Sequence, residues 1–232
     1  MAEDLPDPDV AANLDEVRAR IAAAARDAGR SPDEINLVAV SKLHGADRIV
    51  AALAAGHRQF GENRVQETES KWPPLRERFP DAVLHLVGSL QSNKAANAVA
   101  LFDVIQTLDR PKLAHALALA MDRRGRRPDC YIEVNLGDEP QKGGVQRVDL
   151  ESFVALCRDD LALPVTGLMC IPPADDEPSP YFALLAKLAL RLGLPRVSMG
   201  MSADFEIAVA FGATEVRVGS AIFGPRTSPG AI

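Results

Sequence analysis

Eight short apolar segments alternate with stretches of helical spacing along this chain, and this alternation constrains its fold more than any other feature. The first segment, INLVAVSK at 35–42, is rich in branched residues, which is typical of a strand buried on both faces of a parallel sheet. Further strands are predicted at 58–63, 83–90, 104–108, 130–136, 164–170, 196–202 and 215–223. Eight strands alternating with helices in 232 residues predict a single α/β domain of the (β/α)₈ barrel type.

The predicted helices lie between these strands, and one more precedes the first strand. They cover 11–29, 47–55, 65–78, 93–101, 111–124, 149–159, 180–192 and 204–211, with Pro111 in a first turn and C-caps at Gly29, Gly193 and Gly212. No long linker interrupts the pattern, so we assign residues 1–232 to one domain with a flexible segment at 1–10. The competing open doubly wound sheet usually has a glycine-rich turn after its first strand, and VSKLHGAD lacks one.

Composition excludes several classes of function. The 26 basic and 32 acidic residues give a net charge of −6, which argues against nucleic-acid binding because phosphates require a basic face. No run of about 18 apolar residues and no signal peptide is present, so we expect no membrane span and a cytoplasmic location. Cys130, Cys157 and Cys170 are widely spaced and the four histidines lack ligand spacing, which predicts reduced thiols and no metal site.

In a (β/α)₈ barrel, functional residues lie at the carboxyl ends of the strands. Lys42 ends the first strand directly after LVAV, so its amine is expected at a nonpolar barrel mouth. Desolvation there would lower the pKa of the amine and free it to react with an aldehyde. The alternative interpretation is an exposed lysine just past the strand. Asn63 ends the second strand as a ligand or a helix cap, and His85 on the third strand is a ligand or a core histidine.

The last two strands predict a phosphate site. SMGMSADFE at 198–206 places Ser202 in a tight turn, and VRVGSAIFG at 216–224 places Gly219 and Ser220 in another. Small residues allow the backbone to approach an anion, and serine hydroxyls add donors. Arg217 lies within an apolar strand, where its charge requires a partner, either Glu62 or Asp204 or a bound ligand.

A lysine amine, a phosphate cradle and a buried arginine together suit an aldehyde that carries a phosphate. Pyridoxal 5′-phosphate (PLP) is the leading candidate by this chemistry. A phosphorylated sugar, as in an aldolase, is the alternative at this point.

Five segments resemble the YggS/PROSC family of pyridoxal phosphate homeostasis proteins. They are VAVSK at 38–42, FGENRVQE at 60–67, HLVGSLQSNK at 85–94, GLMCIP at 167–172 and SMGMSADFEIAVAFGATEVRVGSAIFG at 198–224. The resemblance implies a fold-type III PLP-binding TIM barrel like the N-terminal domain of alanine racemase. It also implies that Lys42 forms the internal aldimine with PLP. Further implied roles are phosphate binding by Ser202, Gly219 and Ser220, contact of Arg217 with the pyridine nitrogen, and a ring pocket lined by Asn63, His85 and Met199.

The resemblance further implies a protein of intracellular PLP homeostasis, which buffers or delivers the cofactor and is not an enzyme. Its expected partners are PLP and, transiently, PLP-dependent apoenzymes, and we expect a monomer. A racemase-type enzyme with weak activity is the alternative, but racemisation requires bases on both faces of the bound substrate. Alanine racemases take a tyrosine from a second domain, whereas Tyr131 and Tyr181 of this chain are expected to be structural. A role of Lys142 in handing over the cofactor stays open.

Overall fold

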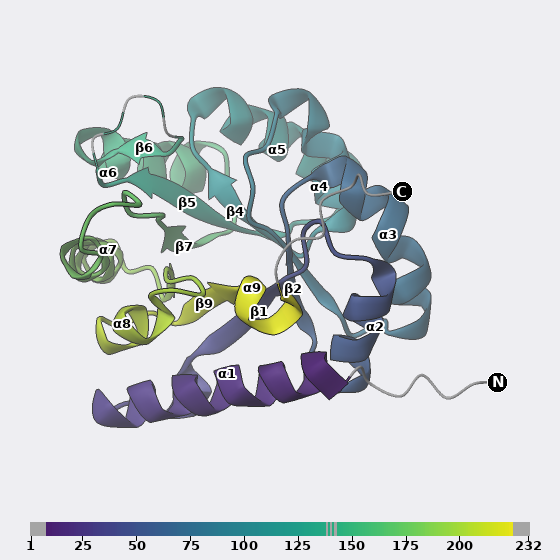
Figure 1. Ribbon diagram of the computed structural model, residues 1–232. Helices are drawn as coiled ribbons and strands as arrows, with labels where there is room; N and C mark the ends of the chain where they lie inside the picture. Colours follow the sequence, from purple (N-terminus) through teal and green to yellow (C-terminus); the bar gives the residue numbers. More distant parts are fainter. Residues whose placement is uncertain (1–7, 138, 140, 142, 225–232) are drawn as a thin grey trace.

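The computed structural model describes residues 8–137, 139, 141 and 143–224, and a closed barrel of parallel strands forms its centre (Figure 1). The barrel strands, in the order in which they pair, are β1 (Asn36–Val40), β2 (Gln59–Glu62), β3 (Val83–Leu86), β4 (Val104–Leu108), β5 (Asp129–Asn135), β7 (Val165–Met169), β8 (Arg196–Ser198) and β9 (Glu215–Val218). β9 pairs with β1 and closes the ring, while the short β6 (Val145–Gln146) adds to β5 outside it. The predicted barrel fold is confirmed.

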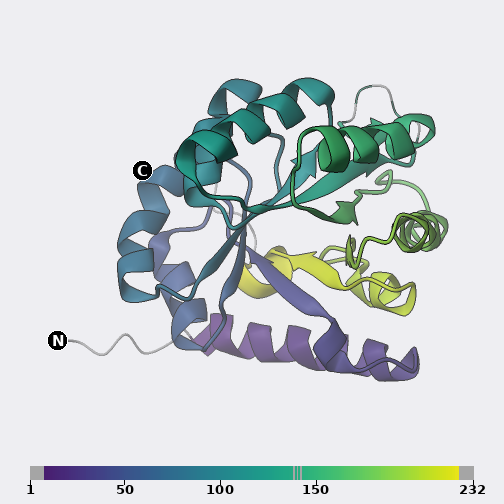
Figure 2. The same ribbon diagram turned by 180° about the vertical axis from the view of Figure 1, so that it is seen from behind.

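The helices surround the barrel (Figure 2). They are α1 (Pro8–Asp27), α2 (Ala46–Ala54), α3 (Val65–Arg78), α4 (Ala95–Leu101), α5 (Pro111–Arg124), α6 (Leu150–Ala155), α7 (Ser179–Arg191), α8 (Phe205–Ala210) and α9 (Ser220–Phe223). The three predicted glycine C-caps are confirmed by positive φ angles of 69°, 63° and 97° at Gly29, Gly193 and Gly212. No helix in the described part of the chain is long and apolar enough to cross a membrane.

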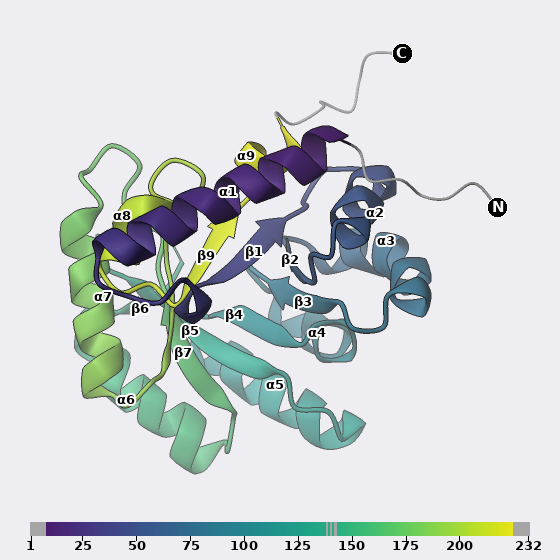
Figure 3. The same cartoon turned by 90° about the horizontal axis from the view of Figure 1, so that it is seen from below.

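The additional N-terminal helix lies across the β9–β1 side of the barrel (Figure 3). Its buried stripe of Val10, Leu14, Val17 and Ile21 packs toward α8 and α9. Asn13 Nδ2 also donates to the carbonyl of Ile222 over 3.0 Å. The helix begins at Pro8, so residues 8–10 are helical rather than flexible, and the rest of the segment predicted to be flexible lies outside the described residues.

The last predicted strand, 215–223, is wrong in its second half. The strand ends at Val218, and residues from Ser220 form α9. The N–H groups of Ile222 and Phe223 both donate to the carbonyl of Gly219 over 2.9 Å. The apolar run continues because Ile222 and Phe223 are buried against α1, and local apolarity alone does not separate a strand from a short buried helix.

Candidate functional site

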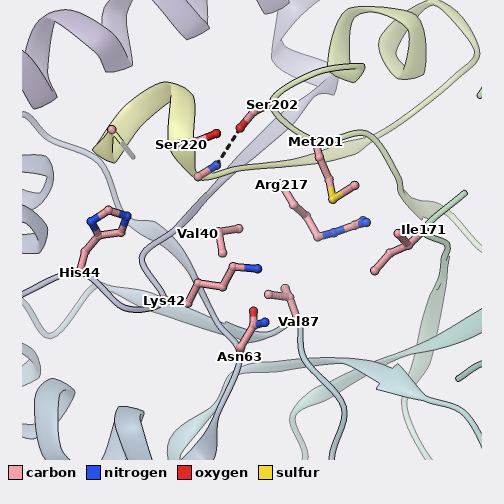
Figure 4. Close-up of a pocket in the computed structure, with 12 residues that line it drawn as sticks. Val40, Lys42, His44, Asn63, Val87, Ile171, Met201, Ser202, Arg217 and Ser220 are labelled. Carbon is pink, nitrogen blue, oxygen red and sulfur yellow. Dashed lines mark hydrogen bonds between the residues drawn. The ribbon is translucent and has the colours of Figure 1, made fainter. Parts of the chain in front are cut away.

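A pocket of about 230 Å³ opens at the carboxyl ends of the strands, where the barrel fold predicts function (Figure 4). It contains residues from the ends of β1, β2, β3, β7, β8 and β9. Six of the eight predicted site residues line it together: Lys42, Asn63, Ser202, Arg217, Gly219 and Ser220. The other lining residues are Val40, His44, Val87, Ile171, Met201 and Gly224.

Lys42 lies two residues after Val40, the last residue of β1, and is half-buried. Figure 4 shows its side chain extending into the pocket between Val40 and Val87, with Asn63 beside it. The lysine is therefore not the exposed residue of the alternative interpretation. Its amine stands at a mouth with apolar walls, within reach of a small ligand.

The loops after β8 and β9 come together on the opposite side of the pocket. The N–H of Gly219 donates to Ser202 Oγ over 3.3 Å, which links the two loops, and Ser220 follows directly (Figure 4). A Cβ on Gly219 would lie 3.2 Å from the carbonyl oxygen of Val40, tighter than an ordinary contact. Glycine thus allows this loop to lie against β1, which brings two hydroxyls and backbone N–H groups to one place.

Arg217 is buried within β9, and neutral oxygens accept its hydrogen bonds. Its Nη1 donates to Ser198 Oγ over 2.8 Å and its Nη2 donates to the carbonyl of Cys170 over 2.9 Å. Among the described residues neither Glu62 nor Asp204 forms an ion pair with it, so the first of the two alternatives for Arg217 is not found. Burial lowers the pKa of the guanidinium, and the side chain lines the pocket.

Two predicted site residues, His85 and Met199, do not line the pocket. His85 points into the barrel two residues before Val87, which places it about 7 Å deeper along β3. Its Nδ1 accepts from Gln106 Nε2 and its Nε2 donates to Gln59 Oε1, both over 2.9 Å. Burial lowers the pKa of the imidazole, and both ring nitrogens bond side chains inside the barrel, so His85 is a core histidine, as the alternative interpretation had it.

Met199 is fully buried, and strand alternation explains its position. Ser198, the preceding residue, points inward to Arg217, so Met199 faces away from the barrel interior. The methionine at the pocket is Met201 instead. Strand alternation does not separate the two methionines, because 199 and 201 have the same parity. Met201 reaches the pocket because the strand ends at Ser198 and the backbone turns at Gly200, where φ is 89°.

A chain of buried polar side chains connects Arg217 to the opposite mouth of the barrel. Ser198 Oγ donates to Gln106 Oε1 over 2.6 Å, and Gln106 Nε2 donates in turn to Glu215. The Tyr131 hydroxyl donates to Glu215 over 3.3 Å. Tyr131 therefore lies far from the pocket, as expected for a structural tyrosine.

Two carboxyl groups with raised pKa values, Glu133 on β5 and Asp109 after β4, escaped the sequence reasoning. Burial raises the pKa of Glu133 to about 7, with a further contribution from the negative charge of Asp109 and an opposing one from Arg217. Burial also raises the pKa of Asp109. An acidic residue inside the apolar strand CYIEVN was the available signal. Lys142 lies outside the described residues.

Comparison with known proteins identifies relatives along nearly the whole chain. The family described as alanine racemase, N-terminal domain, matches residues 12–227. The pyridoxal phosphate homeostasis protein of Escherichia coli K12 is 39% identical over 227 residues, covering 94% of this chain and 97% of that protein. The protein of the same name from Aquifex aeolicus is 36% identical, covering 92% and 96%.

Two solved structures are also similar to this chain over most of its length. The structure of PipY from Synechococcus elongatus with PLP bound superposes on this chain with a TM-score of 0.81 at 37% identity. The superposition covers 93% of this chain and 100% of the PipY chain. Alanine racemase from Clostridium difficile superposes with a TM-score of 0.72 at 13% identity, covering 98% of this chain and 59% of the racemase chain. This similarity shows a shared fold. The chain therefore belongs to the pyridoxal phosphate homeostasis protein family, whose fold is the N-terminal domain of alanine racemase.

Proposed function

We propose that this protein binds PLP in the pocket at the carboxyl ends of the strands and serves PLP homeostasis by buffering or delivering the cofactor. One observation carries the proposal: Lys42, Arg217 and the two serine-bearing loops surround the same cavity of about 230 Å³. The names of the relatives and the PLP in the PipY structure support it.

The residues present suit this cofactor. The cavity is below the roughly 300–1,000 Å³ of sites for drug-sized ligands, so it suits a single-ring compound. Val40, Val87, Ile171 and Met201 supply apolar walls for a ring. Hydroxyls and backbone donors on the loops after β8 and β9 suit a phosphate, with Gly219 allowing the close approach.

The positions of the polar residues that line the pocket indicate a role for each in binding PLP. When bound, PLP supplies an aldehyde with which a primary amine forms a C=N bond as water leaves. Lys42 would provide that amine, Ser202 and Ser220 would hold the phosphate, and Asn63, beside the lysine, would line the ring pocket. Arg217 would donate to the ring nitrogen, and because a guanidinium does not accept a proton, it would keep that nitrogen unprotonated.

The arrangement of bases supports a binding protein over a racemase. Two-base racemisation requires proton acceptors on opposite faces of the substrate. Among the described residues that line the pocket, the one imidazole belongs to His44, two residues after Lys42 on the same loop. Its ring packs against Phe223 with centroids 5.3 Å apart.

We also infer that the protein acts as a monomer in the cytoplasm, delivering PLP transiently to apoenzymes. The buried, unpaired thiols of Cys130, Cys157 and Cys170 suit a reducing compartment. Light scattering of the loaded protein tests the monomer, and a mass of twice the chain would overturn it. Transfer of PLP to an apoenzyme faster than its spontaneous release would support delivery.

Borohydride reduction of the PLP-loaded protein tests the binding proposal. We expect one added phosphopyridoxyl group, mapped by mass spectrometry to Lys42, and its loss in Lys42→Ala. Lys112→Ala, an exposed lysine on α5, is the matched control and should be labelled like the wild type. Labelling at another lysine, or none at all, would refute the proposal. Rapid α-deuteration of an amino acid in deuterated water would instead support the racemase-type enzyme.

A further inference from the structure

Three charged side chains behind the pocket hold the loop that carries Lys42. We infer that Glu62, Glu67 and Lys71 are positioning residues, which fix the turn at 41–44 in the ligand-free protein and so direct Lys42 into the pocket. This inference rests on the proposed function, because it concerns how the reactive lysine is presented. None of the three residues lines the pocket, so their effect passes through the turn.

The turn has a conformation that its sequence does not favour. The N–H of His44 donates to the carbonyl of Ser41 over 3.2 Å, which closes a four-residue turn around Lys42 and Leu43. Leu43 has a φ of 64°, in the left-handed region that glycine usually occupies. Its side chain is 46% exposed, so burial of leucine does not account for the strain. Contacts from elsewhere in the protein must hold this backbone.

Glu67 and Lys71 supply contacts to the backbone on both sides of Lys42. Glu67 Oε1 accepts from the N–H of Leu43 over 2.7 Å. Lys71 Nζ donates to the carbonyl of Ser41 over 3.1 Å and to the carbonyl of His44 over 3.4 Å. The two side chains are one helical turn apart on α3, and their charged atoms are 3.1 Å from each other.

Glu62 completes the arrangement from the end of β2. Its side chain is fully buried, and its Oε1 accepts from Ser41 Oγ over 2.7 Å and from Trp72 Nε1 over 2.9 Å. The same oxygen is 2.7 Å from Lys71 Nζ. Burying either the carboxylate or the ammonium alone would cost free energy, because a buried charge loses its hydration. The two groups therefore have to stay close together in a fixed geometry. The pair therefore holds Ser41, the residue before Lys42, in one place.

The consequence for Lys42 is that the residues on either side of it have fixed backbone positions. A reactive group held in its working geometry avoids the entropy loss of ordering it when the ligand arrives. Glu62 and Glu67 belong to the segment GENRVQE, and Lys71 follows four residues later. Glu62, Glu67 and Lys71 thus act on the loop after β1 rather than on the ligand.

Hydrogen exchange in the ligand-free protein tests the turn itself. Glu67→Ala removes the acceptor of the Leu43 N–H, and the amide to observe is that of His44, whose hydrogen bond Glu67 does not touch. Loss of a hydrogen bond to a carboxylate predicts roughly 10-fold faster exchange at His44. Glu69→Ala removes an exposed carboxylate from the same helix and should leave that rate unchanged. Glu67→Gln keeps an acceptor and should restore most of the protection.

The rate of covalent trapping at Lys42 tests the consequence. On mixing with PLP and quenching with borohydride, Glu67→Ala should label Lys42 roughly 10-fold more slowly than the wild type, and Glu69→Ala at the wild-type rate. Lys71→Met should slow it too, and circular dichroism identifies the case in which this variant unfolds. Unchanged exchange at His44, or faster exchange with unchanged trapping, would overturn the inference. Absence of labelling in the wild type would overturn the proposed function, while the exchange experiment still decides whether the turn is held.

Discussion

Replacing Glu133 by glutamine should stabilise the ligand-free protein at high pH and leave it unchanged at low pH. Burial raises the pKa of this carboxyl from 4.5 to about 7 in the folded protein. Between these two values the folded protein keeps a proton that the unfolded chain has lost. The free energy of unfolding therefore falls as pH rises through this window. Below pH 4.5 both states are protonated and the penalty vanishes.

The size of the effect follows from the same numbers. At 1.36 kcal/mol per pKa unit, the interval from 4.5 to about 7 corresponds to about 3 kcal/mol, and solvent screening of this partly exposed side chain reduces it to about 2 kcal/mol. Urea denaturation at pH 4.5, 6 and 8 measures it. Glu77→Gln, an exposed carboxyl on α3, is the control and should follow the wild type at each pH. A stability difference for Glu133→Gln that does not grow between pH 4.5 and 8 would refute the reasoning.

Three further substitutions test the packing around the pocket by denaturation. Gly200→Ala should destabilise by about 2–4 kcal/mol, because φ is 89° and the new Cβ would lie 2.5 Å from the Cβ of Ala208; a cost below about 1 kcal/mol would contradict this. Ser198→Ala should cost about 1–3 kcal/mol by leaving a buried Arg217 donor without its acceptor, and a neutral result would show that another group replaces the hydroxyl. Leu14→Ala should cost about 2–5 kcal/mol in one cooperative transition, whereas a separate early transition would mean that α1 is not part of the core.

Sequence reasoning worked where the controlling interactions are local. The LVAV run, the stripe through Leu14 and Val17, and the glycine caps reflect periodicity and backbone preference within a few residues, and each prediction was confirmed. The segments that end β1, β2, β8 and β9 also identified six residues that share one pocket. Parallel strands in a barrel place all their carboxyl ends on one face, so this grouping follows once the fold class is known.

Depth within the barrel was not predictable in the same way. His85 on β3 and Val87 directly after it have the same parity, yet Val87 lines the pocket and His85 lies below it. Which layer a residue occupies depends on the stagger between neighbouring strands, and pairing partners set that stagger across long separations in sequence. The hydrogen bond between Ser198 and Gln106 joins residues 92 positions apart.

The amino-acid sequence by itself determined the barrel, its additional helix and most of the residues around the pocket, because these depend on local periodicity and on short motifs. Tertiary structure alone decided that Arg217 bonds neutral oxygens, that the Glu133 carboxyl is desolvated, and that Glu62 and Lys71 hold the turn before Leu43. Burial and charge pairing arise when strands and helices distant in sequence are brought together. Their magnitude depends on distances and solvent exclusion that exist only in the folded protein.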